Sequence, residues 1–351
     1  MKVWISLFAA LMLTACGQQP ESESTTSTDA PPTASETAGE VDRLVVYSSR
    51  QPHLIEPLFQ RYTAETGIEI DFTNDNEASL IERLAAEGEN TPADVLVTVD
   101  AGNLWHAADR GLLRSIDSPA LEASIPAALQ DDRNRWFALS LRARTMVYHP
   151  ERVAIDELST YEDLADPRWQ GRLCLRTSRK VYNQSLVAML IEHHGEQRAE
   201  EIVAGWVANL ATNPFSSDTQ LIEAIAAGQC DVGIVNSYYL GRLQADNPDY
   251  PVQLFWANQG TTGVHVNVSG AGVTLHAPHP EQAQALIEWL ASEAAQAEFA
   301  ERNLEFPANP AVEARGLVRA WGEFRQDETP LTVAGQRQAQ AVRLMDRVGY
   351  R

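Results

Sequence analysis

The stretch that runs from Leu44-Val-Val-Tyr-Ser-Ser-Arg50 to Asp94-Val-Leu-Val-Thr-Val99 decides the fold class. Its opening apolar run predicts a strand that ends in a polar turn. Apolar residues recur at helical spacing over 54–65, alternate as in a strand over 68–72, and return to helical spacing over 79–87. Strands and helices that alternate at this spacing predict an α/β fold, with a mostly parallel sheet covered by helices.

The same alternation continues through the rest of the chain. We expect helices at 161–164, 182–194 and 222–227, and strands at 173–176 and 232–235. At roughly 150 residues per domain, 351 residues suggest two lobes or domains. Neither an internal repeat nor a second linker interrupts residues 43–351, so two lobes must share crossing strands rather than follow one another.

Composition excludes two classes of protein. Because 44% of the residues are apolar, the chain can bury a sizeable core and is not disordered throughout. The formal charge of −21, from 48 acids and 27 bases, argues against nucleic-acid binding, which needs a basic face.

The N-terminus is typical of an exported protein. Lys2 precedes an apolar run of 13 residues, Val3 to Ala15, which is too short to span a membrane. The run ends in Leu13-Thr-Ala-Cys16, which resembles the bacterial lipobox; a chance cysteine after an ordinary signal peptide is the alternative. We therefore expect a lipoprotein signal peptide at 1–15, and a lipidated Cys16 followed by a disordered tether over 16–42.

Two cysteines remain once Cys16 is set aside. In an oxidising exported compartment, the simplest expectation is one disulfide between Cys174 and Cys230. A metal–thiolate site is disfavoured because no Cys-x-x-Cys pair is present.

Common enzyme motifs are missing from the sequence. It has no Gly-x-Ser-x-Gly elbow, P-loop or dinucleotide-binding glycine pattern. His193-His194 is better read as a solvated helix end than as a metal site, because adjacent helical side chains point about 100° apart.

Tyrosines are the more informative residues. Tyr238-Tyr239 follows a predicted buried strand, and Tyr182 opens a predicted helix. Phenolate is a hard anionic ligand suited to a small trivalent cation, and three phenolates would neutralise Fe³⁺. Tyrosines at strand ends are more often packing residues, so both readings stay open on residue type alone.

Several sequence blocks resemble the ferric-ion-binding proteins of bacterial iron(III) ABC transporters, within the extracellular solute-binding superfamily. The similarity covers essentially all of 43–351. The blocks are Tyr47-Ser-Ser-Arg-Gln-Pro52, Thr91-Pro-Ala-Asp-Val-Leu-Val-Thr-Val-Asp100, Trp136-Phe-Ala-Leu-Ser-Leu-Arg-Ala-Arg144, Tyr182-Asn-Gln-Ser185, Asn236-Ser-Tyr-Tyr239, His265-Val-Asn-Val-Ser-Gly270 and Trp321-Gly-Glu-Phe324.

The resemblance implies a set of metal ligands. The family's iron-binding phenolates fall at Tyr182, Tyr238 and Tyr239. Some branches add His-Tyr ligands where this chain has Gln51 and Pro52, and another has a glutamate at the position of Val99. The chain is therefore similar to the branch whose protein ligands are the three tyrosines only.

Three phenolates leave an octahedral ferric ion with open positions, which relatives fill with carbonate, another small anion or water. We expect Ser178, as the residue that opens the helix, and Asn236 to hold such an anion. Arg50 is expected to reach across the cleft, and Arg142 and Arg144 to orient the phenolates. For each arginine, a structural salt bridge is an equally good reading.

The implied architecture is the two-lobed periplasmic-binding-protein fold of type II, with interleaved lobes joined by crossing hinge strands. We assign 43–139 and 269–319 to the first lobe, and 140–268 and 320–351 to the second. Tyr47, Tyr148 and His265 are expected to be structural residues rather than ligands.

The implied function is capture of Fe³⁺ between the lobes by a monomeric, membrane-anchored periplasmic lipoprotein, and delivery to an inner-membrane ABC permease. The hinge would close over the metal, and no chemical turnover is needed. The alternatives are another cargo on the same fold, such as an organic anion or a ferric chelate, a ligand sensor, or an enzyme.

Overall fold

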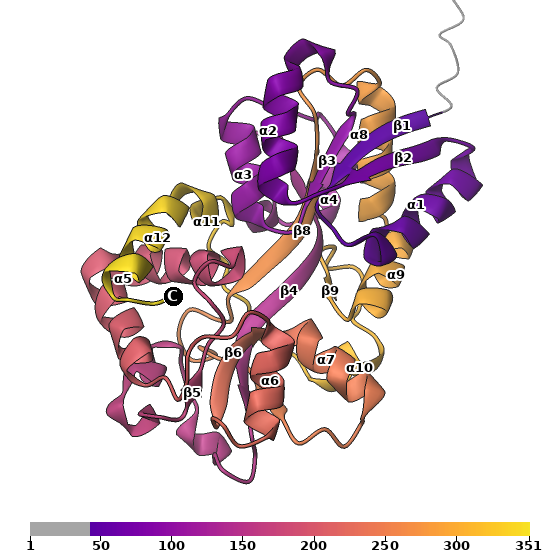
Figure 1. The fold of residues 1–351 in the computed structure, drawn as a ribbon. Coiled ribbons are helices and arrows are strands. Elements are labelled where there is room, and N and C mark those ends of the chain that lie inside the picture. Colours follow the sequence, from indigo (N-terminus) through magenta and orange to yellow (C-terminus); the bar gives the residue numbers. More distant parts are fainter. Residues whose placement is uncertain (1–42) are drawn as a thin grey trace, which may run out of the picture. The chain divides into compact units, whose positions relative to one another are not determined.

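A computed structural model describes residues 43–351 of the chain (Figure 1). Its strands are β1 (Arg43–Ser48), β2 (Glu69–Asn74), β3 (Val95–Thr98), β4 (Phe137–Tyr148), β5 (Leu173–Cys174), β6 (Val232–Asn236), β7 (Gln253–Phe255), β8 (Val266–Val273) and β9 (Phe306–Pro307). Its helices are α1 (Pro52–Thr66), α2 (Glu77–Glu87), α3 (Ala101–Asp109), α4 (Pro119–Ser124), α5 (Val181–Ala208), α6 (Asp218–Ala226), α7 (Ser237–Asp246), α8 (Pro280–Ala291), α9 (Glu293–Asn303), α10 (Gly316–Ala320), α11 (Thr332–Gln336) and α12 (Gln338–Arg347).

The strands pair in the order β2-β1-β3-β8-β4-β6-β5, with β7 and β9 beside β4. The predicted mostly parallel sheet is correct for β2-β1-β3 and for β5-β6. It is wrong for the middle of the sheet, where β4 and β8 run antiparallel to each other and to their outer neighbours. Short apolar runs predict strands well, but they carry no signal for strand direction.

Two long strands join the halves of the sheet, as the fold class requires. The first part of β4 pairs with β8, and its last residues pair with β6 and β7. Figure 1 shows β4 and β8 side by side, with β1–β3 at one end and β5 and β6 at the other. A side chain at Gly270 would place its Cβ 2.6 Å from the carbonyl oxygen of Phe137, so this close approach of the crossing strands requires glycine.

Separate apolar cores form at the two ends of the sheet. One gathers around β1, β3, α1, α8 and α9, and the others gather around β5, β6, α5 and α6. This arrangement is the two-lobed α/β fold expected from the sequence. The residue boundaries assigned to the lobes stay a prediction; Leu331, placed in the second lobe, packs in the first core.

Local sequence explains the main helix limits. Pro52 lies in the first turn of α1, and Gly67 ends that helix with φ at 79°. The helix expected at 182–194 forms the first half of α5 and stops at Gly195, which has φ of 77° and non-helical ψ. Beyond this break the chain resumes a helix as far as Ala208, and the sequence pattern did not predict that continuation.

Candidate metal centre

Three tyrosines lie on the wall of one cavity of about 200 Å³. Tyr238 and Tyr239 occupy the first turn of α7, immediately after β6, and their ring centroids are 4.3 Å apart. Tyr182 is the second residue of α5. The two segments are far apart in sequence, and the fold brings their phenols to one cavity. A larger cavity, of about 660 Å³, has a mainly apolar lining that includes Leu129, Phe306 and Val318, and it contains none of these tyrosines.

The three phenols differ in burial, and burial keeps the Tyr238 phenol protonated. Tyr182 and Tyr238 are 8% and 6% exposed, while Tyr239 is partly exposed. Burial raises the pKa of Tyr238 well above its usual value; the neighbouring Tyr182 and Tyr239 add to the rise, and Arg142 opposes it. The Tyr238 phenol is therefore protonated at neutral pH, and a metal ion that binds to it must release its proton.

Arg144 supports the tyrosines through two asparagines. Its guanidinium donates to Oδ1 of Asn236 at 3.0 Å, and Nδ2 of Asn236 lies 3.4 Å from the Tyr238 hydroxyl. It also donates to Oδ1 of Asn183, the residue after Tyr182, at 2.6 Å and 3.0 Å. Arg144 itself does not line the cavity, so it reaches the tyrosines only through their neighbours.

First-lobe residues form the opposite wall of the cavity. Arg50 pairs with Glu305 at 2.8 Å, and both side chains are buried. Gln51, Pro52 and Val99 are the positions at which the sequence resemblance implied ligands in other branches of the family. Gln51 and Val99 line the cavity, and Pro52 does not. Glu77, which the sequence analysis did not single out, is the other acid on this wall.

Basic side chains surround the tyrosines. The Arg142 Cζ lies 5.1 Å from the Tyr182 ring centroid, and the Lys180 Nζ lies 4.8 Å from it. Arg176 and Arg242, which the sequence analysis missed, also line the cavity. Arg242 follows Tyr238 by four residues on α7, a spacing that signals contact, and its Cζ is 5.0 Å from that ring. Arg176 gave no comparable signal.

Ser178 does not occupy its expected position. Helix α5 begins at Val181, so the expectation that Ser178 opens the helix is wrong. Its carbonyl oxygen accepts a hydrogen bond from Gln184, and Ser178 is not among the residues that line the cavity. Asn236 is held by Arg144, and its amide faces Tyr238.

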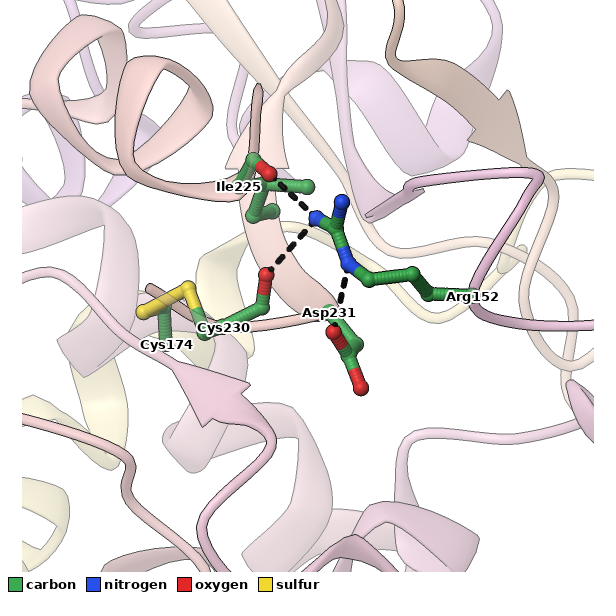
Figure 2. The surroundings of a disulfide bond; sticks show 5 residues. All are labelled: Arg152, Cys174, Ile225, Cys230 and Asp231. Atoms are coloured by element: carbon green, nitrogen blue, oxygen red, sulfur yellow. Dashed lines mark hydrogen bonds and ion pairs between the residues drawn. A yellow bond between two sulfur atoms is a disulfide. The ribbon is translucent and has the colours of Figure 1, made fainter. Parts of the chain in front are cut away.

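The disulfide between Cys174 and Cys230 is confirmed (Figure 2). It joins Cys174, the last residue of β5, to Cys230, which lies just before β6. Strand β6 in turn leads into α7 and Tyr238. Arg152 ties the same corner together, because it donates to the Cys230 carbonyl at 3.2 Å and pairs with Asp231 at 2.8 Å. The start of β6, the strand that leads into α7 and its tyrosines, is thus cross-linked to β5.

Several expectations concern residues outside the described part of the chain. These are the expected signal peptide at 1–15, lipidated Cys16 and tether over 16–42, all of which lie outside the described residues. Within residues 43–351 no helix is both long and apolar enough to cross a membrane. The same residues contain no cluster of three histidine, cysteine, aspartate or glutamate side chains able to hold a metal.

The sequence matches the family of bacterial extracellular solute-binding proteins over residues 90–319. It is 40% identical to Iron uptake protein A1 of Synechocystis over 97% of this chain and 93% of that protein. Among solved structures, it resembles a Trichodesmium protein "in complex with iron and citrate ligands", with 42% identity, a TM-score of 0.84, and coverage of 88% of this chain and all of that one. Ferric iron-binding protein A of Mannheimia haemolytica, in an open conformation, is 36% identical with a TM-score of 0.82, covering 88% of this chain and 99% of that chain.

Proposed function

The chain belongs to the bacterial extracellular solute-binding proteins, and on that basis we propose that it binds ferric ion between its lobes and delivers it to an inner-membrane ABC permease. One observation carries the proposal: Tyr182, Tyr238 and Tyr239 line a single cavity. The names of the relatives, an iron uptake protein and a ferric iron-binding protein, support the choice of cargo.

The chemistry of the donors fits a trivalent ion. Phenolate oxygens are hard, anionic ligands, and three of them offset the charge of Fe³⁺. The ion lowers the pKa of each phenol it binds, so capture releases protons. Release to the permease is favoured by acid and by reduction of the iron, because both weaken the phenolate–metal bond.

The charge around the cavity favours an anion that binds with the iron. Five bases line it, Arg50, Arg142, Arg176, Lys180 and Arg242, against two acids, Glu77 and Glu305. Arg50 is neutralised by Glu305, and Arg176 lies 3.5 Å from the buried Asp218. The remaining positive charge would repel bare Fe³⁺ and attract carbonate, or the carboxylates of a ferric chelate. A ferric–carboxylate complex is therefore the second candidate cargo.

The cellular setting belongs to the same proposal. Export with an acylated Cys16 would hold a monomer at the membrane beside its permease. Binding and release require no chemical turnover, so the protein is a carrier rather than an enzyme, consistent with its solute-binding relatives.

The test is a ferric titration of the mature protein, with bicarbonate present, that follows the phenolate-to-iron charge-transfer band. Tyr182→Phe and Tyr238→Phe should each lose band intensity and bind iron more weakly. Tyr250→Phe, a part-buried second-lobe tyrosine outside the cavity, is the matched control and should behave as the parent does. Parent-like binding by both cavity variants would overturn the site, and absence of any band in the parent would overturn the ferric assignment.

A further inference from the structure

Asp100 lies at the junction of the two lobes and is completely buried. It follows β3 of the first lobe and caps α3, because Oδ1 accepts from the backbone N–H of Gly102 at 2.8 Å. A cap of this kind is common and needs only one carboxylate oxygen. The other contacts of Asp100 are therefore not explained by capping.

Those other contacts come from the hinge and from the second lobe. Oδ2 accepts from Nδ2 of Asn267, on the crossing strand β8, at 2.8 Å. The hydroxyl of Ser185, on α5, lies 3.2 Å from Oδ1 and 3.1 Å from Oδ2. Ser185 and Asn267 are 1% and 3% exposed, so water does not compete for these bonds.

Ser185 connects Asp100 to a proposed metal ligand. It follows Tyr182 by three residues, so the two side chains leave α5 on neighbouring faces less than one turn apart. One turn further along, Met189 packs in the core of the first lobe. The beginning of α5 is thus attached to the first lobe, although the rest of the helix belongs to the second.

We propose that Asp100 is a positioning residue for the iron site, which holds α5, and with it Tyr182, against the first lobe through Ser185. This inference rests on the proposed ferric function. The carboxylate remains buried at this point because it joins three segments, β3–α3, β8 and α5, at the place where lobe movement must be absorbed. Loss of the bond to Ser185 leaves the α3 cap intact but frees Tyr182 from the first lobe.

The test separates this role from ordinary stability. Ser185→Ala removes the contact with α5 and keeps the cap and the Asn267 bond. Thr274→Val is the matched control, because it removes a buried hydrogen bond, from Thr274 to the carbonyl of Ala93, that lies within the first lobe. We expect Ser185→Ala to weaken ferric binding about tenfold, the size expected for one hydrogen bond to a charged group. Thr274→Val should leave ferric affinity unchanged.

A double-mutant cycle with Asp100→Asn identifies the partner of Ser185. If Asp100 acts through this bond, Ser185→Ala has little further effect on ferric affinity in the Asp100→Asn protein. Equal effects of Ser185→Ala in both backgrounds, or equal loss of affinity in the Thr274→Val control, would overturn the proposal.

A measurement without iron keeps this proposal separate from the ferric one. Spin labels at the exposed positions Gln60→Cys, on α1, and Arg198→Cys, on α5, report the distance between the lobes. Ser185→Ala should broaden that distance distribution in the apo protein. An unchanged distribution in Ser185→Ala contradicts the positioning role. If Ser185→Ala broadens as expected but the parent never develops the iron band, only the proposed cargo is contradicted.

Discussion

The Nη1 atom of Arg144 lies 3.0 Å from the Oδ1 atom of Asn236, and neither side chain is more than 1% exposed. The two residues are also opposite each other in the antiparallel pairing of β4 with β6. The same guanidinium reaches Asp218 at 3.2 Å and the carbonyl of Ile234. The Arg144 guanidinium therefore fixes the end of β6, immediately before α7, the helix that carries Tyr238.

Arg144→Lys should destabilise the protein strongly. An ammonium cannot reproduce the forked contacts with Asn183, Asn236 and the fully buried Asp218. We expect the free energy of unfolding in urea to fall by about 2–4 kcal/mol, since buried charge is left poorly paired. Arg198→Lys, which alters an exposed pair with Glu201, is the control and should cost less than about 0.5 kcal/mol. Similar losses in both variants would contradict the buried role.

Lys180→Gln and Arg242→Gln test the anion. If the positive rim binds an anion beside the iron, each variant should weaken ferric binding in excess bicarbonate or citrate by about tenfold. If these cations only repel the metal, the same variants should bind iron more tightly than the parent. Isothermal titration at several anion concentrations distinguishes the two outcomes, with Arg198→Gln as a surface control.

The strand and helix pattern was predictable because short apolar runs and helical spacing are local signals. Thus β1, α1 and the first half of α5 lie close to their predicted limits. The direction of β8 was not predictable, because it depends on which distant strand accepts its backbone bonds. The tyrosine set followed from a resemblance rather than from residue type, which on its own favoured packing.

The charged rim of the cavity was only partly predictable. Arg242 carried a signal, since it is four residues from Tyr238 on the same helix. Arg176 and Glu77 carried none, because they reach the cavity from a loop near β5 and from α2 of the opposite lobe. Asp100 and Ser185 lie 85 residues apart, and only the folded chain shows that they meet.

Removing the disulfide should cost stability while leaving the iron site assembled. The double variant Cys174→Ala, Cys230→Ala removes a cross-link between positions 56 residues apart in the sequence. We expect the free energy of unfolding to fall by about 2–4 kcal/mol. The bonds of Arg152 to the Cys230 carbonyl and to Asp231 remain, so β6 keeps its position and ferric affinity should change little. Urea unfolding with and without dithiothreitol checks this, because a reductant should destabilise the parent and not the variant. If the folded double variant lost iron binding, the disulfide would also be needed to hold the ligands in place.

His265 should make the protein less stable in acid. It is 2% exposed, both ring nitrogens lack hydrogen-bond partners in the described structure, and burial lowers its pKa to about 4. Nearby Asp327 opposes this shift, while Arg144 and Arg142 add to it.

The unfolded chain protonates His265 near the ordinary pKa of 6.5, whereas the folded protein does so only near pH 4. The stability that neutral His265 contributes is therefore fully present above pH 6.5 and is lost as the pH falls towards 4. Relative to His265→Gln, the parent should therefore lose about 2–3 kcal/mol of unfolding free energy between about pH 7 and about pH 4.5. Urea unfolding at several pH values measures the difference, with His106→Gln, at an exposed position, as the control. A constant difference between parent and His265→Gln across this range would mean that His265 is protonated equally in the folded and unfolded chains.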